Sequence, residues 1–380
     1  MAKSKRPLNR EKPSALAEGV FTFLCIKGLM LTGILLINLG TPDSSSPKDV
    51  HRYLTEFLTD KRVVDLPFFQ RQLLVRGVIV PKRYKTSAAS YANIWEPSGS
   101  PLMMHTSQLK TALQKTLGDN YLVEIAMRYQ NPSIEKALET LQKAGVEELM
   151  ILPLFPQYAS ATVGSIYEKI FQLMQNWLTF PHLRMINSFY DHPLMIEAFC
   201  DLARQKNYQA YDHILISFHG LPVNQLKKSL PLHPCQQDRN CCKNLTQSNK
   251  NCYGAQCYHT AKLLAEKLQL ESSNYSVCFQ SRLGKTPWIE PYTSDLLKKL
   301  VLENKKKVLV FSPSFVCDCL ETVYEIGVEY AHEFIQMGGE SLDLVPGLND
   351  HPLWIQALED LIKMSSLKKH QDKELISLES

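Results

Sequence analysis

The segments ILLINLGTP at residues 34–42 and ILISFHGLP at residues 214–222 decide the fold of this chain. Each opens with consecutive aliphatic residues, a pattern typical of a buried strand. Each then reaches a Gly-x-Pro sequence, where the glycine and the proline end the strand in a turn. In the second segment, His219 lies at this junction between strand and loop. The two segments therefore predict equivalent strands in the two halves of the chain.

Three further pairs of segments repeat in nearly the same order in both halves. They are AMRYQNP (126–132) with FQSRLGKTP (279–287), LPLFPQYASATV (152–163) with SPSFVCDCLETV (312–323), and the Asp-His-Pro sequences at 191–193 and 350–352. The first pair presents an arginine near a turn, the second a Pro-x-Phe turn after a strand, and the third opens an amphipathic helix. The shared order predicts that the chain contains one architecture twice.

Amphipathic helical periods lie between the strands, as at Ile134, Ala137, Leu138 and Leu141. The alternation predicts an α/β fold with two similar Rossmann-like lobes, each a parallel sheet flanked by helices. The strand ends should line a cleft between the lobes, where such folds bind ligands. The expected divisions are an N-terminal extension (1–29), a first lobe (30–190) with an apolar lip at about 66–85, a second lobe (191–350) with a cysteine-rich insert (233–257), and a C-terminal helix with a polar tail (351–380).

Composition and the N-terminal segment limit the cellular setting. The apolar run before residue 40 superficially resembles a signal peptide, but Lys27 interrupts it and no small-residue cleavage site follows. We therefore expect the folded protein to start at Met30, with its first strand at 33–39. The 42 basic and 38 acidic residues are too balanced to indicate nucleic-acid binding. Ten cysteines without a secretory signal predict a reducing, cytoplasmic location.

A row of carboxylates follows the strand VLVFS. The stretch FVCDCLETVYEIGVEYAHEF, from Phe315, is expected to form a helix in which Glu321, Glu325 and Glu329 share one face. Like charges at this spacing repel one another, so the row requires solvent, protons or a cation. Together with His219 at the same cleft, it suits proton transfer and the binding of a divalent metal. The alternatives are a solvated acidic face and a histidine packed at the end of the sheet.

The polar segment HPCQQDRNCCKNLTQSNKNCYGAQC concentrates half of the cysteines: Cys235, Cys241, Cys242, Cys252 and Cys257. It has too little apolar material to form a core, so a metal bound by thiolates would order it. The spacing does not match the paired C-x-x-C of zinc ribbons.

From about Leu31 to Leu361 the chain resembles the ferrochelatase family, whose members insert ferrous iron into a porphyrin to make haem. The blocks that carry the resemblance are INLGTPDS, RYLTEFLTDKRVVDLP, MRYQNPSI, LFPQYASATVGS, SFHGLP, QSRLGKTPWIEPYT and CLETVYEIGVEY, in the family's order. The SFHGLP and LET blocks together are highly specific. The resemblance implies a bilobal chelatase-like fold and a lyase that acts on a porphyrin and Fe²⁺.

The resemblance also implies roles for individual residues. His219 and Glu321 would face each other across the porphyrin as catalytic residues and as contacts of the Fe²⁺ substrate, with Glu325 and Glu329 forming an acidic path behind them. The residues implied to bind the porphyrin are Asn38, Leu39, Tyr91, Arg128, Tyr129, Gln280, Ser281 and Trp288. Cys319 stands where the family commonly has a histidine, so the role of that histidine is not carried over.

Some ferrochelatases hold a [2Fe–2S] cluster. Animal members use one first-lobe cysteine and three near the C-terminus, but the corresponding first-lobe residue here is Ser160 and no cysteine follows Leu361. Certain bacterial members resemble this chain in placing four cysteines in an insert after the histidine motif. The implied ligands are Cys235, Cys242, Cys252 and Cys257, with Cys241 as a substitute for its neighbour. A zinc ion and unligated thiols are the alternatives.

A porphyrin requires an apolar entrance. DLPFFQRQLLVRGVIVPKRYK mixes aromatic and aliphatic residues with arginines and lysines, as in a lip that rests on an anionic membrane surface. The alternative is an ordinary core helix with a basic outer face. The lip favours protoporphyrin IX over coproporphyrin, and peripheral contact with the inner face of the cytoplasmic membrane.

Two other classes of protein fit the duplicated lobes less well. A haem or porphyrin carrier would need no histidine opposite a row of carboxylates. A nucleotide-dependent oxidoreductase would need a G-x-G-x-x-G turn after a strand, and the sequence has none. The sequence leaves the oligomeric state open.

Overall fold

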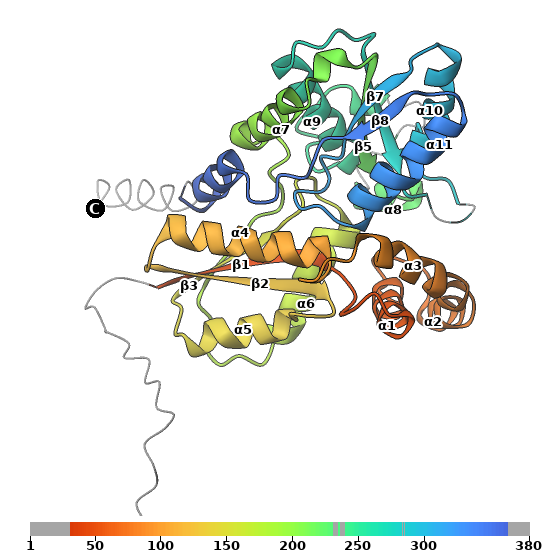
Figure 1. Ribbon diagram of the computed structural model, residues 1–380. Helices are drawn as coiled ribbons and strands as arrows, with labels where there is room; N and C mark the ends of the chain where they lie inside the picture. Colours follow the sequence, from red (N-terminus) through yellow and green to blue (C-terminus); the bar gives the residue numbers. More distant parts are fainter. Residues whose placement is uncertain (1–30, 231–234, 236–239, 283, 285, 364–380) are drawn as a thin grey trace, which may run out of the picture.

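The computed structural model describes residues 31–230, 235, 240–282, 284 and 286–363, which form two α/β lobes (Figure 1). The expected extension at 1–29, part of the cysteine-rich insert and the polar tail lie outside these residues. Each lobe is built on one four-stranded parallel sheet with helices against its faces. The predicted fold class is therefore confirmed.

The first lobe contains the elements before residue 190. They are β1 (Thr32–Gly40), α1 (Pro47–Leu58), α2 (Phe68–Leu74), the π-helix η1 (Val75–Ile79), α3 (Val80–Ile94), α4 (Pro101–Leu117), β2 (Tyr121–Tyr129), α5 (Ile134–Lys143), β3 (Glu148–Pro153), the π-helix η2 (Ser160–Gly164), α6 (Ser165–Met174) and β4 (His182–Met185). The helical period read from the sequence is the buried face of α5, because Ile134, Ala137, Leu138 and Leu141 are its buried residues.

The second lobe follows the same plan. Its elements are α7 (Pro193–Gln205), the 3₁₀-helix η3 (Tyr208–Ala210), β5 (His213–His219), α8 (Val223–Ser229), the 3₁₀-helix η4 (Asn240–Cys242), α9 (Tyr253–Lys267), β6 (Tyr275–Gln280), α10 (Thr293–Leu302), β7 (Lys307–Phe311), the π-helix η5 (Leu320–Tyr330), α11 (Ala331–Gln336) and β8 (Ser341–Leu344). A last helix covers residues 352–363.

The repeat found in the sequence corresponds to a repeat in the three-dimensional structure. The strand orders are β2-β1-β3-β4 and β6-β5-β7-β8, so β1 and β5, the two strands that opened the sequence argument, hold equivalent central places. Because all neighbours are parallel, the ends of β1, β2, β5 and β6 that carry the predicted site residues lie at matching edges of the sheets. The repeated Thr-Val segments also match, since each lies in a π-helix, η2 in one lobe and η5 in the other.

The two lobes share one core. Its largest cluster of buried side chains includes Leu36 of β1, Ile216 of β5 and Trp354 of the last helix. Trp354 stacks at a tilt on Phe189, with 5.5 Å between ring centroids, and Arg184 of β4 donates to the carbonyl oxygen of Ile362 at 2.6 Å. The last helix, dark blue in Figure 1, thus packs against the first lobe although it follows the second. The residue at which one lobe ends stays a prediction.

The prediction that the carboxylate-bearing helix begins at Phe315 is wrong, because residues 315–319 are not helical and η5 starts at Leu320. The carboxylate of Asp318 accepts hydrogen bonds from the amide of Gly347 at 3.0 Å and from the side chain of Asn349 at 2.9 Å. These bonds hold the loop before η5, at residues 315–319, against the loop that follows β8, at residues 345–350. Asp318 also accepts from the Thr322 hydroxyl at 2.9 Å, which orders the first turn of η5.

The expected lip is α2, η1 and the start of α3. Val75 and Val80 are buried, whereas Phe68, Phe69 and Leu73 are 59%, 84% and 76% exposed. Large side chains of this kind are normally inside, so the outward face of α2 is apolar rather than basic. This arrangement differs from an ordinary core helix. Among the described residues, no helix combines the length and the apolar character needed to cross a bilayer.

Candidate active site

His219 lies at the end of β5 and is fixed through its backbone. Its amide donates to the Ser314 hydroxyl at 3.3 Å, and its carbonyl oxygen accepts from the Tyr253 hydroxyl at 2.7 Å. The next residue must be glycine, because a Cβ on Gly220 would lie 2.8 Å from the carbonyl oxygen of Gln280. Gly40 has the same constraint in the first lobe, where a Cβ would overlap the Tyr129 carbonyl. The Gly-x-Pro signal therefore marks the closest approach of neighbouring strands.

The ring of His219 presents one basic nitrogen. Its Nδ1 is 2.7 Å from the carbonyl oxygen of Gly220, and a carbonyl can only accept, so Nδ1 carries the proton and Nε2 the lone pair. Phe315 and Trp288 flank the ring, with centroids 6.2 and 6.5 Å away. Burial lowers the pKa of His219, and the charge of Glu321 opposes this only in part. The imidazole is therefore neutral at physiological pH and can accept a proton.

Glu321 lies where the two lobes meet. It is in the first turn of η5, and its charge acts on His219 of its own lobe and on Tyr91 of the first lobe. Burial raises the pKa of Tyr91, and Glu321 raises it further. Burial likewise raises the pKa of Tyr53, followed by the effects of Tyr91 and Glu321. Tyr53, which no sequence motif singled out, thus lies beside the predicted Tyr91, with 6.3 Å between their ring centroids, and its pKa responds to the same carboxylate.

Glu325 is held by the end of β6. Its Oε2 accepts from the Ser281 hydroxyl at 2.5 Å and from Gln280 Nε2 at 3.3 Å, and Gln280 also donates to the backbone carbonyl of Glu321 at 3.0 Å. Burial raises the pKa of Glu325, although these hydrogen bonds oppose the shift. Burial also raises the pKa of Glu329, which is the more exposed carboxylate. Glu325 is thus half-buried, whereas Glu329, one turn further along η5, is exposed to solvent.

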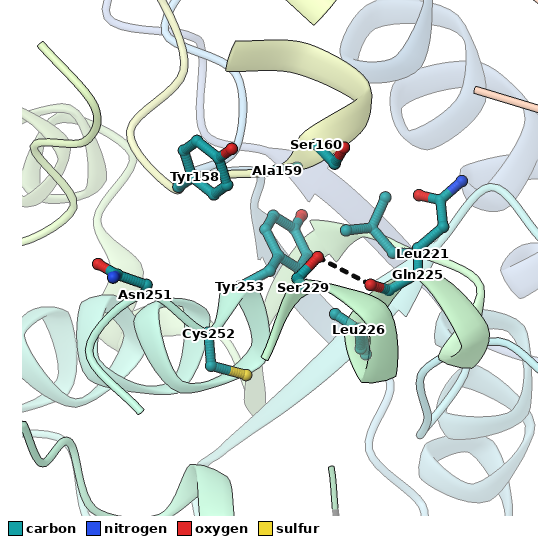
Figure 2. A pocket seen from close by; sticks show the side chains of 10 residues that line it. All are labelled: Tyr158, Ala159, Ser160, Leu221, Gln225, Leu226, Ser229, Asn251, Cys252 and Tyr253. Carbon is teal, nitrogen blue, oxygen red and sulfur yellow. Dashed lines mark hydrogen bonds between the residues drawn. The ribbon is translucent and has the colours of Figure 1, made fainter. Parts of the chain in front are cut away.

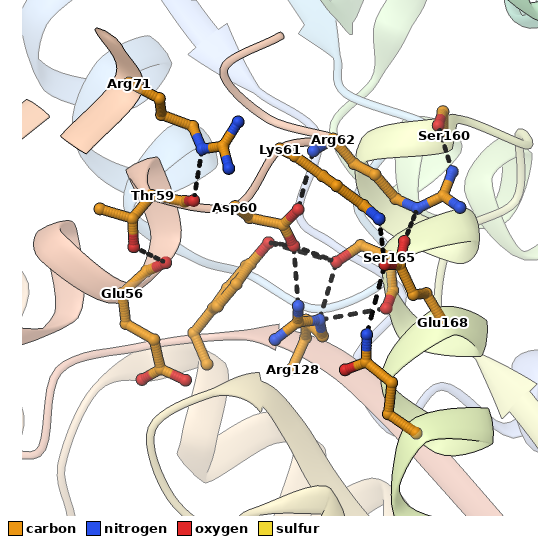
Figure 3. Close-up of polar contacts among 12 residues, drawn as sticks. Glu56, Thr59, Asp60, Lys61, Arg62, Arg71, Arg128, Ser160, Ser165 and Glu168 are labelled. Carbon is orange, nitrogen blue, oxygen red and sulfur yellow. Dashed lines mark hydrogen bonds and ion pairs between the residues drawn. The ribbon is translucent and has the colours of Figure 1, made fainter. Parts of the chain in front are cut away.

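The first-lobe wall contains a buried ion pair (Figure 3). Asp60 Oδ2 accepts from Arg128 Nη2 at 2.7 Å, from the Tyr129 hydroxyl at 2.9 Å and from the Ser165 hydroxyl at 2.5 Å. The guanidinium of Arg128 also lies 4.5 Å from the centroid of the Tyr129 ring. The polar atoms of Arg128 and Tyr129, two predicted porphyrin contacts, are thus bound to Asp60 and Ser165, which the sequence did not single out.

The remaining predicted porphyrin contacts are Asn38 and Leu39 of the first lobe and Trp288 of the second. Asn38, at the end of β1, is buried and donates to the Thr106 hydroxyl at 3.3 Å, while its own Oδ1 accepts from the amide of Leu39 at 3.0 Å. Leu39 and Val323 of η5 both pack against the buried cluster that contains Tyr129. Trp288 is nearly buried against Gly220.

Part of the cysteine set is brought together. The Cys252 thiol raises the pKa of Cys242, and burial and Cys241 add to the shift. Burial raises the pKa of Cys257, to which Cys252 also contributes. The neighbours of Cys235 lie outside the described residues. Within the part of the chain that the structure describes, no three His, Cys, Asp or Glu side chains stand in a metal-binding arrangement. The pKa shifts of Cys242 and Cys257 therefore favour the protonated form of these two thiols.

These residues and their order match a known family over nearly the whole described chain: the family model described as Ferrochelatase matches residues 31–366. The chain belongs to the ferrochelatase family. A ferrochelatase of Coxiella burnetii (strain Dugway 5J108-111) is 43% identical over 344 residues, which cover 90% of this chain and 96% of that protein. A ferrochelatase of Legionella pneumophila (strain Lens) is 44% identical over 333 residues, or 88% and 99% of the two chains. The resemblance seen in the sequence blocks is confirmed.

A solved structure supports the fold. SirB from Bacillus subtilis with Fe³⁺ superposes with a TM-score of 0.51, covering 90% of this chain and 98% of that one at 11% identity. At this identity the match concerns the arrangement of the lobes and not the residues of the site. It shows that the chain shares the two-lobed α/β fold of that structure.

Proposed function

We propose that this chain inserts ferrous iron into protoporphyrin IX, with His219 as the acceptor of the pyrrole protons. Family membership gives the reaction its class, a lyase that places a metal ion in a porphyrin. The observation that carries the residue assignment is the imidazole of His219, neutral, with its Nδ1 tied to Gly220 and the charge of Glu321 acting on it. His219 and Glu321 are the proposed contacts of the iron.

The reaction needs a path for two protons. Both leave the pyrrole nitrogens as the metal enters, and a neutral imidazole is suited to receive the first of them. Glu321, Glu325 and Glu329 then provide sites of graded exposure along η5 by which protons leave or metal arrives. The proposed porphyrin contacts are Asn38, Leu39, Tyr91, Arg128, Tyr129, Gln280, Ser281 and Trp288. The apolar face of α2 favours protoporphyrin over the more polar coproporphyrin.

The test is anaerobic metal insertion by His219→Ala, followed by the loss of porphyrin fluorescence after ferrous iron is added. His213→Ala is the matched control, because His213 is a buried histidine at the other end of the same strand. We expect His219→Ala to bind porphyrin without inserting iron, and His213→Ala to insert it. Insertion by His219→Ala at the wild-type rate would reject the assignment. Tight porphyrin binding without insertion by the wild type would support a carrier instead.

Membrane contact at the lip is a further part of the proposal, on the cytoplasmic face of the membrane. Phe69 and Leu73 are the most exposed apolar residues of α2, so replacing both with serine should leave the fold intact. We expect Phe69→Ser/Leu73→Ser to lose binding to anionic liposomes. The control is Leu178→Ser/Phe180→Ser, which removes exposed apolar side chains elsewhere in the same lobe. Unchanged sedimentation of the lip variant with liposomes would contradict membrane contact.

The insert is proposed to hold a [2Fe–2S] cluster through Cys235, Cys242, Cys252 and Cys257, with zinc as the alternative. What supports the proposal is that Cys242 and Cys252 contact each other and that Cys252 also acts on Cys257. A bound cation would hold them as thiolates, the reverse of the pKa shifts that they have without it. Protein purified without oxygen should contain iron and acid-labile sulfide. A colourless preparation that contains zinc instead would favour the alternative.

A further inference from the structure

Two hydroxyl groups hold the backbone of His219. The Tyr253 hydroxyl donates to the His219 carbonyl oxygen at 2.7 Å, and the Ser314 hydroxyl accepts from the His219 amide at 3.3 Å. These two hydroxyls are 3.1 Å apart and hydrogen bond to each other. Both side chains are buried, Tyr253 with 7% of its surface exposed and Ser314 with 7%. The end of β5 is thus closed into a small ring of hydrogen bonds from which water is excluded.

Tyr253 belongs to the cysteine-rich segment. It is the first residue of α9, and Cys252 is the residue that precedes the helix. Cys257, one turn further along, acts on the Tyr253 hydroxyl, because the pKa of Tyr253 is raised by burial and then by Cys257. A Cβ on Gly254 would lie 3.0 Å from Cys242 Sγ, so the first turn of α9 packs directly against the thiols. Any rearrangement of the thiols therefore acts on the turn that carries Tyr253.

The same turn is also fixed to the first lobe. Gln256 Oε1 accepts from the amide of Tyr158 at 2.7 Å. Figure 2 shows Cys252 and Tyr253 on one side of a pocket, with Tyr158, Ala159 and Ser160 of the first lobe across from them. The first turn of α9, at residues 252–257, therefore contacts the thiols, the first lobe and the end of β5, where His219 lies.

We propose that Tyr253 is a positioning residue for His219 and that it transmits the state of the cysteine segment to the reaction. The inference rests on the proposed role of His219 in taking up pyrrole protons. The ring of His219 is oriented by the carbonyl oxygen of Gly220, so its direction depends on the backbone that Tyr253 and Ser314 hold. Ligation or oxidation of the thiols shifts the first turn of α9, and Tyr253 carries the shift to His219.

The test for positioning is Tyr253→Phe, which removes one hydroxyl and keeps the ring. Tyr208→Phe is the matched control, because Tyr208 belongs to η3, before the opposite end of β5, and its hydroxyl donates to the carbonyl oxygen of Leu268 at 3.0 Å in the same lobe. We expect kcat of Tyr253→Phe to fall roughly tenfold to a hundredfold, as small misplacements of reacting groups do, with an unchanged Kd for the porphyrin. Tyr208→Phe should retain the wild-type kcat.

A second measurement follows the backbone directly. Hydrogen exchange of the peptide that covers residues 213–222 reports on the His219 amide without any reaction. We expect faster exchange there in Tyr253→Phe and in Cys257→Ser than in Tyr208→Phe. We also expect Cys257→Ser to have a smaller effect on kcat in the Tyr253→Phe background than in the wild type, because the connection is already broken.

The outcomes separate the two proposals. If His219→Ala abolishes insertion while Tyr253→Phe matches Tyr208→Phe in kcat and in exchange, the positioning role is wrong and the role of His219 stands. If His219→Ala inserts iron normally, the assignment of His219 fails, and the role of Tyr253 fails with it. Independent, additive effects of Tyr253→Phe and Cys257→Ser would refute the transmission from the thiols.

Discussion

Replacing Asp60 by asparagine should destabilise the first lobe severely. Asp60 Oδ2 accepts from Arg128, Tyr129 and Ser165, and Oδ1 accepts from the amide of Arg62 at 2.8 Å. In asparagine, an NH2 group replaces one of these two oxygens, and in either orientation it faces at least one hydrogen-bond donor. The neutral side chain also leaves the charge of Arg128 without its carboxylate partner. The side chains of Asp60 and Arg128 are 7% and 14% exposed, so the cost is that of breaking a buried pair, about 3–5 kcal/mol.

The assay is urea unfolding at pH 7, with Glu139→Gln as the control. Glu139 pairs with Lys143 on the surface, where such a pair contributes about 0.3–0.5 kcal/mol. Burial would raise the pKa of Asp60, but hydrogen bonds from Ser165 and Arg62 and the charge of Arg128 outweigh it and hold the pKa below its usual range. The stability gained from this shift is therefore complete at pH 7 and is lost as the pH falls below about 4. Unfolding curves of Asp60→Asn and Glu139→Gln that coincide would refute the argument.

Two further changes test the site's construction by thermal denaturation. Because burial raises the pKa of Glu325, its ionised form is disfavoured in the folded chain and the penalty grows as the pH rises above about 4.3. Glu325→Gln should therefore gain more in melting temperature relative to wild type at pH 7 than at pH 4, and an equal difference at both would contradict this. Gly220→Ala should lose about 1–3 kcal/mol of stability through the 2.8 Å contact with Gln280. Gly77→Ala, whose Cβ would have its nearest neighbour at 4.0 Å, should change stability by less than about 0.5 kcal/mol, so equal melting temperatures would show that the contact is relieved.

The fold was predictable because each repeated segment can be recognised from a few neighbouring residues. Each strand end carries its own signal, an aliphatic run followed by Gly-x-Pro, and the glycines at 40 and 220 are required by the close approach of the neighbouring strand. The parallel order of the sheets then places the strand ends together. His219 and Glu321 could be selected from such signals, with the family resemblance to assign their roles.

The start of η5 and the partners of His219 could not be predicted in this way. The helix begins late because Asp318 binds Gly347 and Asn349, residues 29 and 31 positions further along the chain. Tyr253 reaches His219 only because α9 begins beside the end of β5, and no spacing in the sequence predicts that contact. Such partners are chosen by tertiary packing, on which local periodicity carries no information.

The placement of the last helix affects how the chain folds while it is being synthesised. Trp354 and Ile362 complete a core whose other side is built from β1, β4 and α4, residues made much earlier. Until residues 352–363 leave the ribosome, the first lobe exposes the apolar surface that this helix will cover. The nascent chain is therefore most vulnerable to aggregation late in translation, and we expect chaperones to bind this face of the first lobe.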